Sequence, residues 1–235
     1  MLLSRAAGFD LAEQVRSRDG APLGDVFAFL SGLYFRGKLA YAQAFARAPR
    51  RLKPGGPSRR DSTSVGQGFP PPRGVESPAL RRDLAVVPPD RGTKAGSPAR
   101  PGGVFIITPS RGLQAPDFAV TARMLEEFAR VQIEAANAAY RQPLEASARL
   151  LAGVAGRAEV VLLGSIATGK YVDVLLDVFG ARLLFPADFV GRGDMSRGGL
   201  MLRCARAGQE LACVPVRGAV RHGQRPPKLE PLRHR

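Results

Sequence analysis

The feature that most constrains the fold is a strand, a glycine loop, a helix and a second strand in direct succession. Residues 160–163 are four consecutive apolar residues, typical of a strand buried on both faces. Residues 172–179 are apolar at intervals of three and four, which predicts a helix, and Gly180 is a natural stop for it. Residues 183–185 predict the second strand. The order predicts a βαβ crossover with parallel strands.

Other apolar runs predict the rest of a single α/β domain, made of residues 1–49 and 102–216. Further strands are predicted at 25–30, 103–108 and 211–216, and further helices at 39–48, 121–138 and 143–154. Residues 200–204 fit either the end of a helix or a strand. Together these elements predict an α/β, three-layer sandwich with a mainly parallel central sheet of about 4–5 strands and helices on both faces.

The loop that opens the crossover helix predicts an anion site. Gly164, four residues, Gly169 and Lys170 match most of the phosphate-binding pattern G-x-x-x-x-G-K-[ST], in which free backbone N–H groups meet a positive helix end. Tyr171 stands where that pattern has Ser or Thr, so a phosphotransferase of the P-loop kind is the less favoured hypothesis. A plain turn capped by Thr168 is the other alternative. The ligand-binding residues predicted in this loop are Gly164, Ser165, Thr168, Gly169 and Lys170.

A second polar loop, 188–199, holds four glycines, two arginines and two aspartates. Its arginines can grip an anion through paired hydrogen bonds, and its aspartates can act as a base or orient a hydroxyl. A solvated turn with weak Asp–Arg pairs is the alternative. The residues predicted here are Asp188 and Asp194 as catalytic groups and Arg192, Ser196 and Arg197 as ligand contacts.

Two further loops, 31–38 and 109–113, add Arg36, Ser110 and Arg111 to the predicted ligand-binding set. In an open α/β sheet, loops that leave the carboxyl ends of strands line one crevice. The hypothesis is therefore that all four loops meet there.

Two stretches, YFRGKLAYA at 34–42 and VFIITPSRGLQAPD at 104–117, resemble paired motifs of a known family. The pattern, "LY…F…AYA" followed by "hhILSxxxGLxxPD", occurs in the uracil-DNA-glycosylase-like small domains that accompany archaeosine-type tRNA-guanine transglycosylases, and in related bacterial proteins. Ser110 and Asp117 fall on motif positions, whereas Thr108 and Pro109 replace a Leu-Ser step. The resemblance implies an α/β sandwich with a pocket for a base or nucleotide, no catalytic histidine and no assigned reaction.

The formal net charge of +15 is concentrated in two segments. Residues 50–101 carry 11 Lys and Arg against 4 Asp and Glu, and residues 217–235 carry 6 against 1. The first segment is rich in proline, glycine and arginine, and both are predicted to be disordered, the one as an insertion and the other as a tail. They suggest the alternative function, a noncatalytic interaction module whose basic arms contact nucleic acid or acidic partners.

The rare residues exclude several classes of site. Both histidines, His222 and His234, lie in the basic tail, which excludes Ser-His-Asp and Cys-His catalysis and His-ligated metals from the predicted domain. Cys204 and Cys213 are too few for a structural zinc site, so no metal is predicted. The chain starts without a secretory pattern, and no apolar run is long enough to span a bilayer, so a cytoplasmic protein without a membrane partner is expected.

The sequence therefore predicts an intracellular α/β protein that binds a nucleotide, a nucleobase or another anionic ligand in a crevice of glycine loops. A role in nucleic-acid base modification is one hypothesis for such a protein. No cofactor is indicated, and neither the ligand nor the oligomeric state is specified.

Overall fold

The computed structural model describes residues 5–47, 103–227 and 229, with side chains from Asp10 onward. The predicted insertion at 50–101 and the end of the predicted tail lie outside the described residues. The helices are α1 (Arg5–Arg16), α2 (Leu23–Phe45), α3 (Ala122–Arg130), α4 (Ala138–Ala155), α5 (Gly169–Phe179) and α6 (Asp194–Ala207), with short 3-10 turns η1 (Gly180–Arg182) and η2 (Ala187–Phe189). The strands are β1 (Ala21–Pro22), β2 (Ile106–Thr108), β3 (Gly112–Gln114), β4 (Ala119–Val120), β5 (Val160–Val161), β6 (Leu183–Pro186) and β7 (Cys213–Pro215).

The predicted three-layer sandwich with a mainly parallel sheet is wrong. Over the described residues, the strands form three small sheets: β1 with β4, β2 with β3, and β5–β6–β7. Only β5 and β6 run parallel, with Val160 opposite Leu183, and the other pairs are antiparallel. The βαβ crossover of β5, α5 and β6 is confirmed, but no large central sheet surrounds it.

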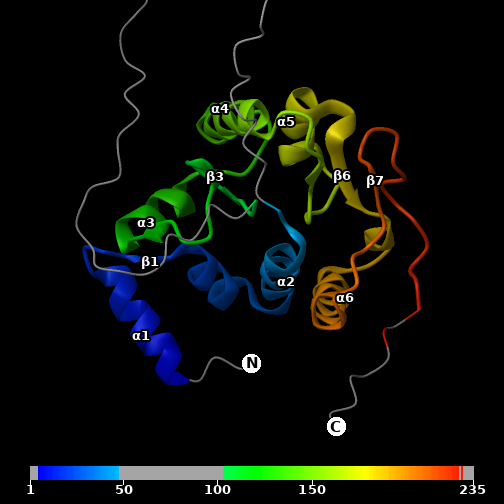
Figure 1. The fold of residues 1–235 in the computed structure, drawn as a ribbon. Helices are drawn as coiled ribbons and strands as arrows, with labels where there is room; N and C mark the ends of the chain where they lie inside the picture. Colours follow the sequence, from blue (N-terminus) through cyan, green and yellow to red (C-terminus); the bar gives the residue numbers. More distant parts are fainter. Residues whose placement is uncertain (1–4, 48–102, 228, 230–235) are drawn as a thin grey trace, which may run out of the picture. The chain divides into compact units, whose positions relative to one another are not determined.

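The main reason why the predicted sheet does not form is the segment at 25–30, which was predicted to be a strand but is helical. It lies inside α2, and the predicted loop at 31–38 continues the same helix (Figure 1). A short apolar run fits a buried helix as well as a strand, and here the Lys, Leu and Ala residues that follow at 38–40 favour the helix. Gly32 interrupts α2 with a φ of 64°, a conformation that favours glycine.

The bounds and types of other predicted elements also differ from those observed. The helix predicted at 121–138 ends at Arg130, and α4 begins only at Ala138. The loop predicted at 188–199 is mostly helical because α6 starts at Asp194 and runs through 200–204. The strand predicted at 211–216 is confirmed as β7.

Two apolar cores organise the described chain, and α2 contributes to both. The first half of α2 places Leu23 and Val26 in a core with Val120 and Phe128. The second half places Tyr41 in a larger core built on α4, α5, α6 and the β5–β6–β7 sheet. In Figure 1, α2 packs beside α6 and α4 beside α5. Among the described helices, none is both long enough and apolar enough to cross a membrane.

Candidate anion site between α2 and α6

Two glycines bring α2 and α6 unusually close together. A Cβ atom on Gly37 would lie 2.5 Å from the carbonyl oxygen of Gly198, and one on Gly198 would lie 2.8 Å from the carbonyl oxygen of Leu33. Real Cβ atoms do not approach backbone this closely, so any larger residue would push the helices apart. The contact places the neighbours of these glycines, Lys38 on α2 and Arg197 on α6, at one junction.

Polar side chains from three elements gather at this junction, and we name them the α2–α6 site: Tyr34, Lys38, Tyr171, Asp194 and Arg197. Arg197 anchors the group. Its Nε donates to the carbonyl oxygen of Phe189 over 3.1 Å, its guanidinium lies 5.6 Å from the Phe189 ring, and its Nη1 is 3.6 Å from Asp194 Oδ1. The Arg197 side chain is only 15% exposed, whereas that of Asp194 is 66% exposed.

Lys38 sits beside this group without a carboxylate of its own. Its Nζ lies 3.9 Å from the centroid of the Tyr34 ring, a cation–π contact. Among the described residues, no carboxylate reaches Lys38 within salt-bridge distance. The half-buried ammonium therefore lies against a ring face, with no ion-pair partner among the described residues.

Tyr171 closes the site from the crossover helix α5. Its phenol donates to the carbonyl oxygen of Ser165 over 2.8 Å. A Cβ on Gly164 would lie 2.6 Å from the same phenol oxygen, so this glycine leaves room for the ring. The phenol therefore lies against the loop at 164–165, while Tyr34 donates a longer bond of 3.5 Å to the carbonyl oxygen of Leu163.

Burial sets the protonation of these groups. It lowers the pKa of Lys38 to about 8; the nearby Arg197 acts in the same direction, and Asp194 opposes it. Burial also raises the pKa of Tyr171 to about 12, with the Tyr34 phenol adding to the shift. The pKa of Tyr34 rises for the same first reason, although Arg197 opposes the rise. Both phenols are therefore neutral donors, and Lys38 changes charge close to physiological pH.

A small cavity of about 10 Å³ opens next to the site. Its walls are Gly164, Ile166, Phe185, Phe189, Val190, Arg197 and Arg221. This volume holds about one water molecule. None of the lining side chains is acidic, and both charged ones are arginines.

The other ligand contacts predicted in the loops at 164–170 and 188–199 lie away from the α2–α6 site. Thr168 occupies the N-cap position of α5 but makes no side-chain capping bond, and both Thr168 and Lys170 are exposed. Gly169 is the first residue of α5. Arg192 donates to the carbonyl oxygen of Asp188 over 3.0 Å and to Ser196 Oγ over 3.4 Å, so this trio forms a local cluster.

Arg36 lies on α2, two residues from both Tyr34 and Lys38, and is partly buried. Asp188, by contrast, is exposed in η2. Of the two aspartates predicted as catalytic, only Asp194 reaches the α2–α6 site.

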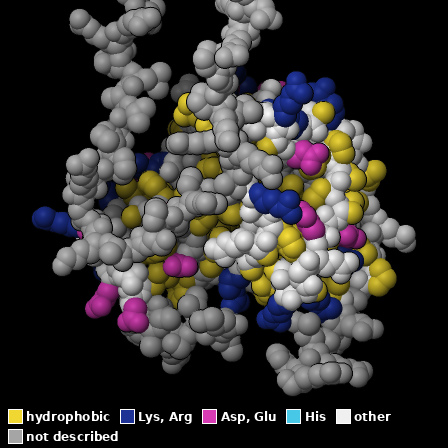
Figure 2. All heavy atoms as spheres, in the orientation of Figure 1, with side chains coloured by type: hydrophobic (Ala, Val, Ile, Leu, Met, Phe, Trp, Pro, Cys, Tyr) yellow, Lys and Arg dark blue, Asp and Glu magenta, His cyan; other side chains and the backbone are white. Residues whose placement is uncertain are grey.

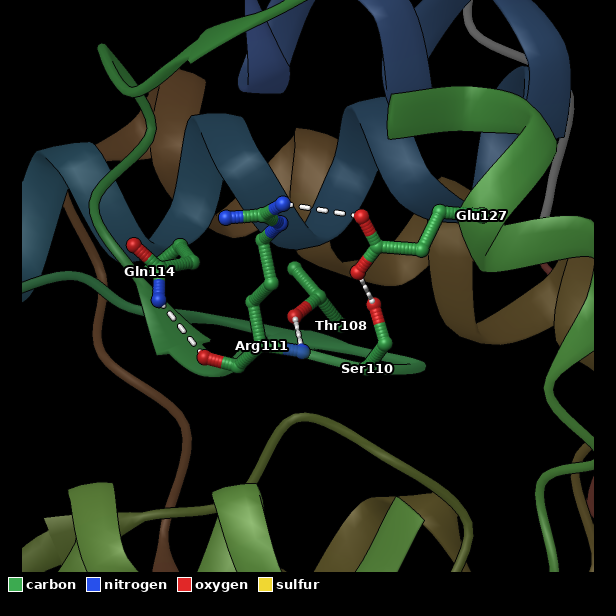
Figure 3. A network of polar contacts seen from close by, with 5 residues as sticks. All are labelled: Thr108, Ser110, Arg111, Gln114 and Glu127. Atoms are coloured by element: carbon green, nitrogen blue, oxygen red, sulfur yellow. Dashed lines mark hydrogen bonds and ion pairs between the residues drawn. The ribbon is translucent and has the colours of Figure 1, made fainter. Parts of the chain in front are cut away.

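Ser110 and Arg111 belong to a different group, the Glu127 cluster, which we define as Ser110, Arg111 and Glu127. One Glu127 oxygen accepts from Ser110 Oγ over 2.5 Å and the other pairs with Arg111 Nη2 at 2.8 Å (Figure 3). These two bonds lower the pKa of the Glu127 carboxyl group. Arg111 lies in the turn between β2 and β3, and its charge is neutralised by Glu127 of α3.

The four predicted loops therefore do not share one crevice as a set. The segments around 34–38, 164–171 and 194–197 converge, whereas the turn at 109–113 is bound to α3. The sequence prediction missed Tyr34, Lys38 and Tyr171. The usable signal was the glycine beside Lys38 and the glycine pair beside Arg197, since adjacent small residues in two helices mark a close crossing.

Within residues 10–47 and 103–227, no group of three or more His, Cys, Asp or Glu side chains is placed to hold a metal ion. Comparisons of the chain with protein-family models, with curated proteins and with solved structures give no match. The functional proposal therefore depends on the geometry of the site and on the sequence resemblance given above.

Proposed function

We propose that the protein binds a small anionic ligand, a nucleotide, nucleobase derivative or sugar phosphate, at the α2–α6 site. The observation that carries this proposal is an excess of positive charge in a partly buried place. Arg197 and Lys38 come from two different helices, and Asp194, the carboxylate that lies near them among the described residues, is mostly in solvent.

This excess of positive charge at the α2–α6 site supports the binding of an anion there. A cation removed from water without a partner loses solvation free energy, and proteins usually match such charges with hydrogen-bonded anions. Glu127 provides that match for Arg111. At the α2–α6 site, the match is incomplete among the described residues, and an anionic ligand completes it.

The nucleobase branch of the proposal is supported by the resemblance at 34–42, because this stretch contains Tyr34 and Lys38. Phe185 and Phe189, both almost fully buried, form apolar walls of the adjoining cavity. Aromatic and apolar walls with a few convergent charges are typical of sites for small organic anions.

Isothermal titration calorimetry with sulfate, phosphate, uridine and guanosine monophosphates and the free bases tests the proposal. We expect binding of at least one anion, weakened about 30-fold or more in the Arg197→Met variant, because an arginine–anion pair contributes about 2 kcal/mol. The Arg111→Met variant is the matched control and should bind as the unaltered protein does. No binding of any anion at millimolar concentration, or equal losses in both variants, would reject the proposal.

The competing proposal is contact with polyanions through the basic segments. On the face shown in Figure 2, Lys and Arg side chains are interspersed with Asp and Glu and do not gather into one patch. Titration with a single-stranded oligonucleotide separates the two proposals. Tight, steeply salt-dependent binding that survives Arg197→Met would favour the polyanion interpretation.

A further inference from the structure

The segment 217–227, which we name the strap, lies against one wall of the cavity beside the α2–α6 site. It starts where Val216, almost fully buried, donates its N–H to Leu183 over 2.8 Å. A Cβ on Gly223 would lie 2.5 Å from Val190 Cγ1, and one on Gly191 would clash with the carbonyl oxygen of Gln224. The strap therefore packs closely on the Val190 side chain and on the backbone of Gly191.

Arg221 places the strap at the cavity. It lines the same small space as Arg197 and Gly164. Two arginines from separate parts of the chain thus border one cavity whose other lining residues are uncharged. Like charges repel across such a space, and a tetrahedral anion between them would replace that repulsion with paired hydrogen bonds.

The cavity is too small for this anion in the conformation described. About 10 Å³ accommodates one water molecule and not a phosphoryl group. The strap is the wall that can yield at the lowest free energy, because it contains no helix or strand. Such segments open locally at much lower free energy than packed elements do.

We propose that the ligand carries a phosphoryl group, and that the strap opens to admit this group and closes on it with Arg221 facing Arg197. This inference rests on the proposed function and specifies its ligand class and its mode of entry. The phosphoryl group is held as a dianion by two arginines, one fixed on α6 and one brought by the strap.

The test uses the full-length protein and phosphate as the probe, with Arg221→Gln compared with Arg225→Gln. Both arginines are exposed strap residues, but only Arg221 lines the cavity. We expect Arg221→Gln to weaken phosphate binding about tenfold or more, and Arg225→Gln to change it less than about twofold, because only the first loses a charge-assisted bond.

Limited trypsin digestion followed by mass spectrometry gives a second readout. Saturating phosphate should slow cleavage after Arg217 and Arg221 in the unaltered protein, because the closed strap is protected. Gly223→Val, which forces a side chain against Val190, should speed this cleavage and weaken binding.

Different results would reject the strap inference and the α2–α6 site. If phosphate binds and Arg197→Met abolishes binding while Arg221→Gln and Arg225→Gln behave alike, the strap inference is overturned and the α2–α6 site stands. Cleavage rates that phosphate leaves unchanged also overturn the strap inference. Absence of phosphate binding by the unaltered protein overturns the strap inference, and absence of binding by every anion tested overturns both.

Discussion

The tripeptide Ser-Arg-Gly occurs at 110–112 and again at 196–198, and the two copies have different surroundings. In the first, Arg111 pairs with Glu127 at 2.8 Å, and the two side chains are 38% and 42% exposed. In the second, Arg197 is 15% exposed, and its carboxylate neighbour stands 3.6 Å away in solvent. The same three residues thus make a closed ion pair in a turn and an incompletely matched cation at a helix crossing.

The comparison teaches that a motif rich in Gly, Ser and Arg does not define a binding site by itself. What differs is the partner that tertiary structure supplies. Glu127 comes from α3 and occupies both donors of its cluster, whereas the α2–α6 site faces mainly phenols and backbone carbonyl groups. Only the second leaves a positive charge for a ligand to neutralise.

The largest effect is expected from the glycine that follows Arg197. Gly198→Ala should lower the free energy of unfolding by about 3 kcal/mol, because the added methyl group would overpack against the backbone of Leu33 and Tyr34. Gly199→Ala is the control: its Cβ would meet only Leu229 Cδ1, at 3.6 Å. Urea denaturation measures both, and equal stabilities would refute the close crossing of α2 and α6.

The next effect concerns the charge of Lys38. Because its pKa is lowered to about 8, Lys38 is charged below that pH and becomes neutral as the pH rises through it. We expect sulfate affinity to fall about tenfold between about pH 7 and about pH 9 as the ammonium, and with it about 1.4 kcal/mol of attraction, is lost. Calorimetry with sulfate, which does not titrate in this range, measures the change.

The Lys38→Met variant is the control for this pH dependence. It should bind sulfate weakly at both pH values and be at least as stable as the unaltered protein near neutral pH, because burying the ammonium disfavours the folded state. A pH profile unchanged by this substitution would assign the titration to another group.

The smallest effect is expected when each of the two carboxylates is replaced by the corresponding amide. Asp194→Asn should tighten sulfate binding about threefold, because it removes a partly screened negative charge near Arg197. Glu127→Gln should leave that affinity unchanged and reduce stability by less than about 1 kcal/mol, as expected for a half-exposed ion pair. Tighter binding in Glu127→Gln but not in Asp194→Asn would show that the anion binds at Arg111 and not at Arg197.

Local patterns predicted the crossover well. The helical spacing at 172–179 separates two short apolar runs at 160–163 and 183–185, and β5, α5 and β6 follow this order. The run at 25–30 is also short and apolar, and such a run fits a buried helix as well as a strand, so its assignment as a strand failed. The loss of this strand, together with the antiparallel pairing of β2 with β3 and of β6 with β7, left no large parallel sheet among the described residues.

The candidate site was only partly visible from the sequence. Arg197, Asp194 and Gly164 were predicted from glycine-rich loops and do meet at the junction. Lys38 and Tyr34 were left out of the predicted set because their relevance arises from the packing of α2 on α6, a contact between segments far apart in the chain. Tyr171 was treated only as a departure from a phosphate-binding pattern, although its phenol closes the site.

The break at Gly32 lets one helix serve two cores. Leu23 and Val26 lie before it in the smaller core, and Tyr41 lies after it in the larger one. Neither core can melt without removing part of α2 from the other, so thermal unfolding should be cooperative across both, a single calorimetric transition and not two.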